Sequence, residues 1–455
     1  MDAGGRKEES DMEQVQIIDS CTISPPMEVS FPTTPLKLSS FDRIFGSFPP
    51  IRRVLFYDTD DSSSFLSHLR GLKASFSKAL QHFPALAGKL VRSHEADELE
   101  IDCLNPSVTF VVAETTLHYH RLVGEEEYDE AALQALAPSL NLTVLPIPVM
   151  SVQVTRFSGA GMAVGFVVHH AAVDGHGLWQ FMKCWTEICR SGCDNIPLVA
   201  SLDRSIFNGL HENVVISGDH HQKAQNARGS WLQNHHAPTP RTFVLSSSVI
   251  KSLKSRANNH GHGCNGRHPV STFVALSAQV WTCSTLAREV ETEDEDTCFF
   301  FTMDCRGLID APSLEDYRNC IKPCKVLTKV HQLIGEDGFK LSIEAIQRAI
   351  CEAKKLGIKD SGEWALQIED PPSASLYVSG SPRFRVYETD FGWGRPSKVE
   401  LVGMNREGMM TLAGARDDEG GVQLTIALSP SHMNKFASLF LEELKYEKYD
   451  KLASE

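Results

Sequence analysis

The apolar run GMAVGFVV at residues 161–168 constrains the fold most, because two histidines and then an amphipathic helical pattern follow it directly. A nearly continuous apolar run of this length is typical of a strand that is buried on both faces of a sheet. We therefore expect a strand over residues 161–170. Apolar residues next recur at helical spacing from Leu178 to Cys189, which predicts an amphipathic helix. The stretch between them, HHAAVDG, lies at a strand-to-helix turn, where loops held by rigid elements often carry chemistry.

Two adjacent histidines, His169 and His170, occupy this turn. Successive side chains of a strand point to opposite faces, so only one of the two rings faces any given ligand. Three interpretations compete: a metal site, packing of both rings in the core with Asp174 as a helix cap, and general-base catalysis by one ring. The sequence places no further ligands at a standard spacing, so we expect no metal. Core packing and catalysis stay open at this point.

The spacing of His170, Asp174 and Gly175 adds a second observation. A histidine with an ordinary pKa of about 6.5 accepts a hydroxyl proton near neutral pH, and glycine permits a sharp exit into the helix. Another motif, DFGWG, lies at residues 390–394 and sets two glycines around an aromatic pair. Taken alone, it is an ordinary glycine-rich turn that Phe391 and Trp393 staple together.

The 455 residues are enough for two domains. The polar N-terminus, residues 1–13, is predicted to be disordered. Strand and helix patterns then fill residues 14–204, which we expect to form an N-terminal α/β domain. Residues 205–238 are poorly patterned and predict a long crossover loop. The patterns restart in residues 239–455, which predict a second mixed α/β domain.

Charge and composition exclude several classes of protein. A formal net charge of −14 argues against a general nucleic-acid-binding protein, which normally carries a basic face. The charged N-terminus lacks the apolar region of a signal peptide, and the longest apolar run is too short for membrane insertion. We therefore expect a cytoplasmic protein, and reduced thiols at its 12 cysteines, which form no CxxC pair.

Together, HHAAVDG near the middle and DFGWG near the C-terminus resemble the BAHD plant acyltransferases. These enzymes transfer an acyl group from a coenzyme A thioester to an alcohol or amine. The resemblance covers nearly the whole chain, since LSSFD, LDRS and STFVALSAQVW also match the family's pattern in the same order. Residues 379–400 are similar to the branch that acylates anthocyanins and other phenolic glycosides, often with malonyl groups.

This resemblance implies an α/β fold of two chloramphenicol-acetyltransferase-like domains, each a mixed β-sheet with flanking helices, and an active-site channel between them. It implies a monomer with no bound cofactor, whose partners are small molecules: acyl-CoA as co-substrate and a phenolic or flavonoid glycoside as acceptor. His170 is the expected general base, with no covalent acyl-enzyme. Asp390 is predicted as a catalytic residue together with His170, although the resemblance implies that DFGWG is remote from the acyl transfer and matters more for the CoA channel and domain packing. Asp174 is expected to be structural and to pair with Arg306.

The remaining residues of the DFGWG motif receive roles near the site. Phe391, Gly392 and Gly394 are expected to shape the channel. Trp393 is expected to be a structural residue at the active site, and its indole N–H is a candidate donor to the oxyanion of the tetrahedral intermediate.

Coenzyme A carries phosphates, so we expect a local basic patch. The candidates for CoA binding are Lys251, Lys254 and Arg256, with Ser271 and Thr272 at a helix start. Solvated surface and N-capping are the competing interpretations. Arg318 is a further candidate, because the segment DYRNC at residues 316–320 departs from the Tyr-Phe-Gly-Asn-Cys that is usual in the branch. Three interpretations of a cation at this position stay open: it reaches the carboxylate of the acyl group, it narrows the channel, or it points to solvent.

Other functions remain open on the sequence. A hydroxycinnamoyl donor, or an amine acceptor, is the alternative within the same enzyme class. Peptide-synthetase condensation domains share the HHxxxDG pattern, although the DFGWG loop counts against them. A catalytically silent protein that binds CoA or phenolics is the alternative outside enzymes, and the intact His170 counts against it.

Overall fold

The computed structural model describes residues 15–28, 31–59, 64–93, 98–124, 128–193, 238–260, 269–289, 295–309, 317–357, 372 and 374–452. Two compact units make up the chain: unit 1 comprises Met1–Gln225, Ala311–Cys320 and Phe384–Gly403, and unit 2 comprises Asn226–Asp310, Ile321–Arg383 and Met404–Glu455. The predicted disordered segment 1–13 and the predicted crossover loop as far as residue 237 lie outside the described residues.

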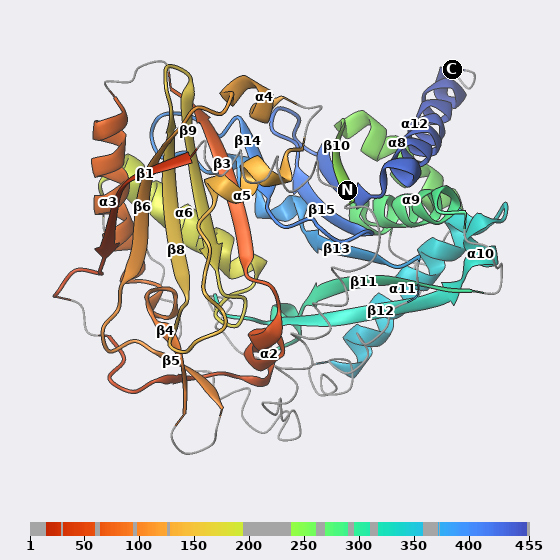
Figure 1. Ribbon diagram of the computed structural model, residues 1–455. Helices are drawn as coiled ribbons and strands as arrows, with labels where there is room; N and C mark the ends of the chain where they lie inside the picture. Colours follow the sequence, from red (N-terminus) through yellow and green to blue (C-terminus); the bar gives the residue numbers. More distant parts are fainter. Residues whose placement is uncertain are drawn as a thin grey trace, which may run out of the picture. The chain divides into compact units, whose positions relative to one another are not determined.

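Unit 1 is built on a six-stranded mixed sheet (Figure 1). Its strands follow the order β1 (Val15–Ile23), β6 (Val108–Thr115), β8 (Met150–Phe157), β9 (Gly161–Val168), β3 (Ile51–Asp58) and β14 (Lys398–Leu401). β6 and β8 are parallel, and the other neighbouring pairs are antiparallel. All residues of β9 are buried, which confirms the predicted buried strand, although the strand ends at Val168 rather than at residue 170.

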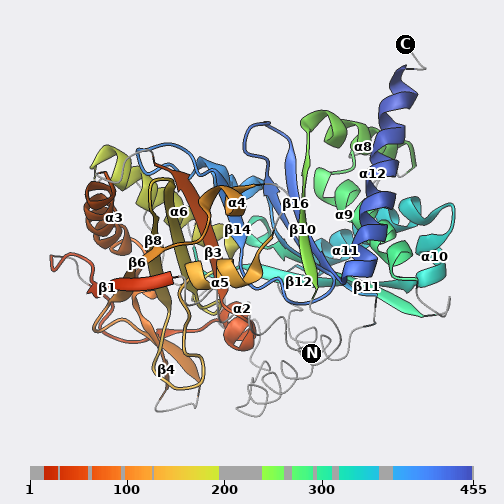
Figure 2. The ribbon, with the colours of Figure 1, turned by 45° about the horizontal axis from the view of Figure 1, so that its top comes forward.

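Helices cover both faces of this sheet. α3 (Phe65–Leu80) and α6 (Gly175–Ser191) lie against one face, and α4 (Tyr119–Val123) and α5 (Glu130–Leu136) lie against the other (Figures 1 and 2). Phe76 of α3 packs on Phe110 of β6 and on Trp185 of α6, with ring centroids 6.0 and 4.8 Å apart. The amphipathic stripe predicted after residue 177 is therefore the buried face of α6, and the predicted helix is confirmed.

A smaller sheet and a short helix complete the part of unit 1 that concerns the site. This sheet has the order β2 (Leu36–Lys37), β5 (Leu99–Asp102), β4 (Lys89–Arg92) and β7 (Ile147–Pro148). α2 (Ser40–Arg43) follows β2, and a 3-10 turn (Ile44–Ser47) continues it. α2 begins with a capping box in which the Ser39 and Asp42 side chains each accept from the other's backbone N–H.

Unit 2 is a second six-stranded mixed sheet with helices. Its strands follow the order β10 (Thr239–Leu245), β16 (Val422–Leu428), β15 (Met409–Gly414), β13 (Leu376–Gly380), β11 (Asp296–Asp304) and β12 (Ile321–Lys329). The buried helix α9 (Thr272–Ala287) packs against α8 (Ser247–His260), α10 (Val330–Ile334), α11 (Gly338–Leu356) and α12 (Pro430–Leu452). Trp281 at its centre donates to the Thr297 hydroxyl at 3.0 Å, so even the largest side chain of this core has its polar atom satisfied.

The predicted C-terminal domain, residues 239–455, is wrong for two segments. Ala311–Cys320 and Phe384–Gly403 belong to unit 1. The second segment supplies β14, which pairs with β3 so that Lys398 lies opposite Phe56. Elements that are consecutive in sequence usually lie side by side, and chain order therefore favoured the wrong unit for this edge strand.

Ten cysteines of the described part are free thiols, but Cys351 of α11 is disulfide-bonded. The expectation of reduced thiols is therefore wrong at this position, because sequence spacing does not reveal which cysteines a fold brings within bonding distance. None of the helices in the described residues is both long enough and apolar enough to cross a membrane.

Candidate active site

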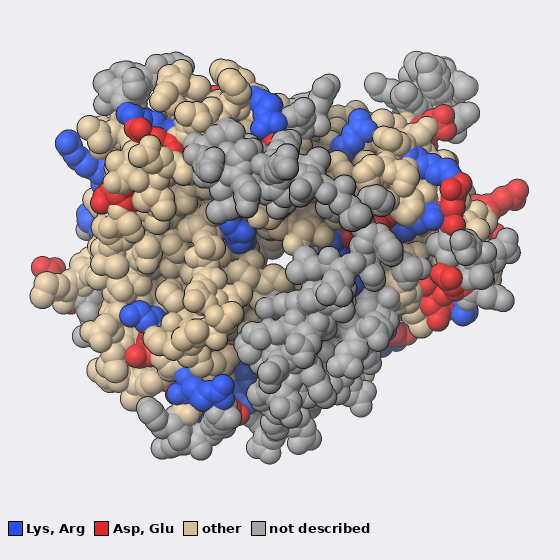
Figure 3. All heavy atoms as spheres, viewed as in Figure 1, with Lys and Arg blue, Asp and Glu red and all other residues tan. Residues whose placement is uncertain are grey.

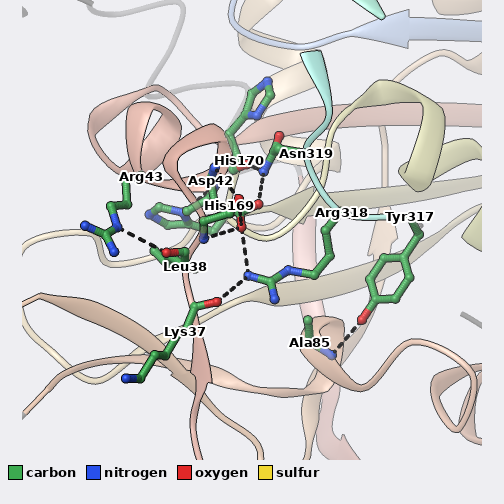
Figure 4. Close-up of polar contacts among 12 residues, drawn as sticks. Lys37, Leu38, Asp42, Arg43, Ala85, His169, His170, Tyr317, Arg318 and Asn319 are labelled. Carbon is green, nitrogen blue, oxygen red and sulfur yellow. Dashed lines mark hydrogen bonds and ion pairs between the residues drawn. The ribbon is translucent and has the colours of Figure 1, made fainter. Parts of the chain in front are cut away.

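The turn between β9 and α6 separates the two histidines. His169 has 3% of its surface exposed, and its ring Nδ1 accepts a hydrogen bond from the Ala171 backbone N–H at 3.2 Å. His170 is half-buried, and its ring points in a different direction from that of His169 (Figure 4). Because the strand ends at Val168, strand alternation does not set these two directions. Of the pair, only His170 therefore keeps part of its surface exposed.

Asp174 joins two segments that lie far apart in the sequence. Its carboxylate is fully buried, and Oδ1 caps α6 by accepting from the Gly177 backbone N–H at 2.9 Å. Oδ2 accepts from the Cys320 backbone N–H at 3.0 Å. Both carboxylate oxygens thus accept from backbone N–H groups, which supports a structural role for Asp174.

The two glycines of this turn allow close packing. A Cβ atom on Gly177 would lie 1.6 Å from the Tyr317 carbonyl oxygen, so no side chain fits there without a shift of the backbone. A Cβ on Gly175 would lie 2.8 Å from the Phe384 ring, and this glycine has no positive φ. Gly175 is therefore required by the approach of Phe384, rather than by the sharp exit that we expected.

Aromatic rings and burial set the state of His170. Its imidazole stacks on Phe45, with centroids 4.2 Å apart and planes 13° apart, and Phe48 meets it edge-on at 6.3 Å. Burial lowers the pKa of His170 below its ordinary value, more than its own carbonyl, the Asp174 charge and Asn319 raise it. The imidazole is consequently neutral at pH 7, the state that a general base requires.

A buried polar network holds the backbone of His170 (Figure 4). Asn319 donates from Nδ2 to the His170 carbonyl at 2.9 Å and to Asp42 Oδ1 at 3.1 Å. Arg318 donates to Asp42 Oδ2 at 2.9 Å and to the Lys37 carbonyl at 3.2 Å. Tyr317 anchors the same segment, since its hydroxyl accepts from the Ala85 backbone N–H at 3.1 Å.

The predicted role of Arg318 in substrate binding is wrong. Its side chain is 1% exposed and its guanidinium is paired with Asp42, which is fully buried. A buried carboxylate requires a cation or several donors, and the arginine meets this need inside unit 1. The prediction failed because a sequence does not show which carboxylate lies beside an isolated arginine.

The DFGWG motif forms a different kind of turn. Asp390 Oδ1 accepts from the Gly392 and Gly394 backbone N–H groups at 2.8 and 3.0 Å. Both glycines have positive φ, 107° and 106°, which favours glycine over other residues. Phe391 is buried against Tyr57 and Trp185, with centroids 5.7 and 4.8 Å away.

This motif lies at the opposite end of β3 and β9 from His170. Trp393 packs on His68 and Tyr57, and Tyr57 is opposite Met162 near the start of β9. Six residues separate Met162 from Val168, a span of about 20 Å at 3.3 Å per strand residue. The Tyr57 hydroxyl also fixes the segment by donating to the Thr389 carbonyl at 2.9 Å.

Two predictions about this motif are therefore corrected. Asp390 is not a catalytic neighbour of His170, because its carboxylate holds its own loop at the far end of the strand pair. Trp393 has no ring contact with His170, and its aromatic partners are Tyr57, His68 and Phe391. Shaping of a channel by Phe391, Gly392 and Gly394 stays a prediction.

A family model described as the Transferase family matches residues 13–442, nearly the whole chain. The chain belongs to this family, the BAHD acyltransferases. Among curated relatives, phenolic glucoside malonyltransferase 1 of Arabidopsis thaliana is 29% identical over 95% of this chain and 98% of its own length. Coumaroyl-CoA:anthocyanidin 3-O-glucoside-6''-O-coumaroyltransferase 2 of the same plant is 30% identical, with the same coverage of both chains. A Dahlia pinnata malonyl-coenzyme A:anthocyanin 3-O-glucoside-6''-O-malonyltransferase is 29% identical over 94% of this chain and 97% of its own.

Solved structures share the fold of this BAHD acyltransferase. The crystal structure of vinorine synthase matches with a TM-score of 0.69 and 18% identity, over 93% of this chain and 96% of that one. F. sporotrichioides TRI101, complexed with coenzyme A and T-2, matches with a TM-score of 0.70 and 17% identity, over 89% and 97% of the two chains. These likenesses confirm the predicted fold class of two sheet-rich domains with flanking helices.

The predicted CoA-binding residues of the acyltransferase lie in unit 2. Arg256 is engaged there: it donates to Glu443 at 2.8 Å and to Gln279, and it lies 4.1 Å over the Phe339 ring. Its predicted role toward CoA stays a prediction, and it would require the guanidinium to exchange some of these partners. Ser271 caps α9 by accepting from the Val274 backbone N–H, as the competing interpretation held.

Lys251, Lys254 and Thr272 stay predictions as CoA contacts. Lys251 is exposed, and the other two are partly buried. On the face shown in Figure 3, Lys and Arg side chains are scattered among other residues rather than gathered in one patch. Arg306 also belongs to unit 2, where it donates to Asp304 at 3.1 Å. Its pairing with Asp174 would join the two units, and it stays a prediction.

Sequence reasoning missed Asp42, Asn319 and Phe45 as parts of the site. The Ser-x-x-Asp spacing of Ser39 and Asp42 was a signal for a capping box and for nothing more. Asn319 matches the pattern that is usual in the branch, and this match by itself assigns no role to it. Within the described residues, no group of three or more His, Cys, Asp or Glu side chains is arranged to hold a metal.

Proposed function

We propose that this BAHD acyltransferase is an acyl-CoA-dependent O-acyltransferase that acts on a sugar hydroxyl of a phenolic or flavonoid glycoside such as an anthocyanin, with malonyl the favoured acyl group. The observation that carries the proposal is the state of His170. Its imidazole is partly exposed, stacked on Phe45 and kept neutral by burial, at the end of a buried strand. A neutral, fixed and accessible imidazole is what deprotonation of an alcohol requires.

In this mechanism, the proton that leaves the acceptor hydroxyl is passed through His170 to the CoA thiolate. His170 accepts the hydroxyl proton of the acceptor as the oxygen attacks the thioester carbonyl carbon. The tetrahedral intermediate then collapses, the carbon–sulfur bond breaks, and the imidazolium returns the proton to the CoA thiolate. The products are an ester and free CoA thiol. Phe45, with its ring centroid 4.2 Å away, presents its face to the transient imidazolium.

A covalent acyl-enzyme is not needed. The nucleophilic form of cysteine is the thiolate. Burial raises the pKa of Cys103 and Cys184 in unit 1 to about 12, so these thiols are protonated at neutral pH. Direct attack by the acceptor hydroxyl remains the simplest route.

Relatives with either of two donor types match this chain equally well. Names of similar proteins specify malonyl transfer at 29% identity and coumaroyl transfer at 30% identity. Malonyl-CoA carries a carboxylate that requires a cation, and Arg318, which the sequence offers for this role, is paired with Asp42. Hydroxycinnamoyl transfer to a glycoside, or to an amine as in agmatine coumaroyltransferase, is therefore the second candidate.

One assay tests the function and chooses the donor. Purified protein is incubated with malonyl-, acetyl- or coumaroyl-CoA and a panel of flavonoid glucosides plus agmatine, and products are identified by mass. We expect a single acyl adduct on a glucoside, with malonyl-CoA the best donor. A coumaroyl adduct alone would move the assignment to the second candidate. Binding of CoA without any adduct would replace the enzyme by a silent binding protein.

We also propose a cytoplasmic, monomeric enzyme, as expected from the sequence. Static light scattering of the purified protein at assay concentration measures the mass directly, and a dimer mass would contradict the monomer. A fluorescent fusion expressed in plant cells tests the location.

A further inference from the structure

Three polar side chains near His170 have no role in the proposed proton transfer, although they are almost fully buried. Arg318, Asp42 and Asn319 form a continuous series of contacts that ends on the His170 carbonyl. Burying two charges and an amide costs free energy unless each finds partners. Their position beside the proposed base therefore indicates a role in addition to packing.

The chemistry of its two partners fixes the orientation of the Asn319 amide. Asp42 Oδ1 and the His170 carbonyl are both acceptors, and both lie within 3.1 Å of Nδ2. A rotated amide would present its oxygen to these two acceptors and lose both hydrogen bonds. The amide is thus held in one orientation for as long as Asp42 is ionised.

Arg318 keeps Asp42 in that ionised state. Asp42 Oδ2 accepts from Arg318 at 2.9 Å, from the Ser39 hydroxyl at 2.7 Å and from the Ser39 backbone N–H at 2.9 Å. A buried carboxylate that loses its cation tends to take up a proton and become a donor. The neighbouring Arg43 cannot replace Arg318 without leaving its own partners, Glu98 and the Leu38 carbonyl.

Packing, rather than a hydrogen bond at Nδ1, holds the ring of His170. Among the described residues, the buried Nδ1 atom has no hydrogen-bond partner, whereas the ring stacks on Phe45 with centroids 4.2 Å apart. The hydrogen bond from Asn319 to the His170 carbonyl holds the backbone from which this ring projects.

We propose that Arg318, Asp42 and Asn319 are positioning residues that hold the backbone of His170 and therefore the placement of its ring, and that this series of contacts depends on the charge of Arg318. The inference rests on the proposed function. The relay does not touch the substrate, so its loss lowers the rate of the chemical step and leaves the binding of acyl-CoA unchanged.

Four variants test the relay: Arg318→Met, which removes the charge and keeps the length, Arg318→Lys, Asn319→Ala and the double variant Arg318→Met/Asn319→Ala. We expect Arg318→Met and Asn319→Ala each to lower kcat by about 10- to 100-fold, the size of effect that a small misplacement of a catalytic group produces. KM for acyl-CoA stays within a factor of about two, Arg318→Lys recovers part of kcat, and the double variant is no worse than the worse single one.

Arg43→Met is the matched control, because Arg43 lies beside Asp42 in sequence but pairs with Glu98. It should keep wild-type kcat. Nitrogen NMR of histidine-labelled protein gives a readout without turnover. The His170 ring signal, identified by its absence from His170→Ala, should shift in Asn319→Ala and keep its wild-type position in Arg43→Met.

Failure of the relay is distinguishable from failure of the proposed function. Wild-type kcat in folded Arg318→Met and Asn319→Ala, with His170→Ala inactive, would overturn the relay alone. Additive losses in the double variant, or an unchanged His170 signal in Asn319→Ala, would also overturn it. A wild-type protein with no transferase activity would overturn the function, and the NMR comparison would still decide the relay.

Discussion

Two aspartate–glycine turns of unit 1, HHAAVDG and DFGWG, look alike in sequence and differ in structure. Asp174 is fully buried and binds the backbone of two segments, at Gly177 and Cys320. In the described part of the chain, the hydrogen bonds of the Asp390 carboxylate are to the backbone of its own loop, at Gly392 and Gly394. The Asp174 carboxylate links segments that are 146 positions apart in sequence, whereas the Asp390 carboxylate fixes the conformation of its own five-residue loop.

The surroundings of the two turns differ in the same way. His170 lies among a stacked phenylalanine and a buried ion pair, whereas Trp393 lies among Tyr57, His68 and Phe391 in an aromatic cluster. The proposed general base therefore lies at one end of β9, and an aromatic cluster lies at the other.

The largest expected effect separates the two histidines of these regions. His170→Ala should lower kcat by about 10²- to 10⁴-fold, the usual contribution of a general base. His68→Ala, in the DFGWG cluster, should change kcat by less than about threefold, since it only packs on Trp393. Initial rates with saturating donor and acceptor measure both, and equal losses in the two variants would remove the distinction.

The two aspartates should differ in stability. Asp174→Ala removes a helix cap, worth about 1 kcal/mol, and leaves the buried Cys320 N–H unsatisfied, at about 1–3 kcal/mol. Asp390→Ala exposes N–H groups of a loop whose glycines are exposed to water, so we expect about 1 kcal/mol. Urea unfolding followed by far-ultraviolet circular dichroism compares them, and a larger loss in Asp390→Ala would reverse the assignment.

One glycine from each turn, Gly177 and Gly394, should also differ in what its substitution costs in stability. Gly177→Ala drives a methyl group into the Tyr317 carbonyl and should cost about 1–3 kcal/mol or more, as overpacking does. Gly394→Ala meets nothing within 4 Å, so only its positive φ opposes the change, at about 1–2 kcal/mol. Activity should fall in Gly177→Ala and persist in Gly394→Ala at temperatures where both are folded.

The smallest effect is the dependence on pH. Because burial lowers the pKa of His170, kcat/KM should be flat above about pH 6.5, the unfolded value, and fall only on further acidification. The sign for stability is the same: the neutral ring is favoured in the fold, so its contribution is present above the unfolded pKa and lost as pH falls through the folded one. An acid limb of kcat/KM above pH 6.5 would contradict this assignment.

Local pattern was enough to predict several features. The buried strand before His169 and the helix after Gly177 follow from the apolar run and from the 3.6-residue period. These two predictions succeed because backbone geometry depends on neighbours within a few residues. Two sheet-rich domains followed instead from the resemblance of motifs in order along the chain.

Partners that are distant in sequence could not be predicted. Arg318 was expected at the substrate and lies against Asp42, 276 positions away in sequence. Asp390 was predicted to be catalytic and Trp393 to be a candidate oxyanion donor, but the register of β3 with β9 sets the aromatic cluster of their loop at the other end of the strand pair from His170. β14 was assigned to the wrong domain because its partner strand is more than 340 positions earlier.

The sequence by itself therefore determined that His170 is a candidate general base, that it lies in a strand-to-helix turn, and to which family the chain belongs. Only the tertiary structure decided what holds that histidine. Hydrogen bonds and ion pairs are made by groups that are close in space. In this chain the groups behind His170 come from residues 39–42 and 317–320, which no local pattern connects.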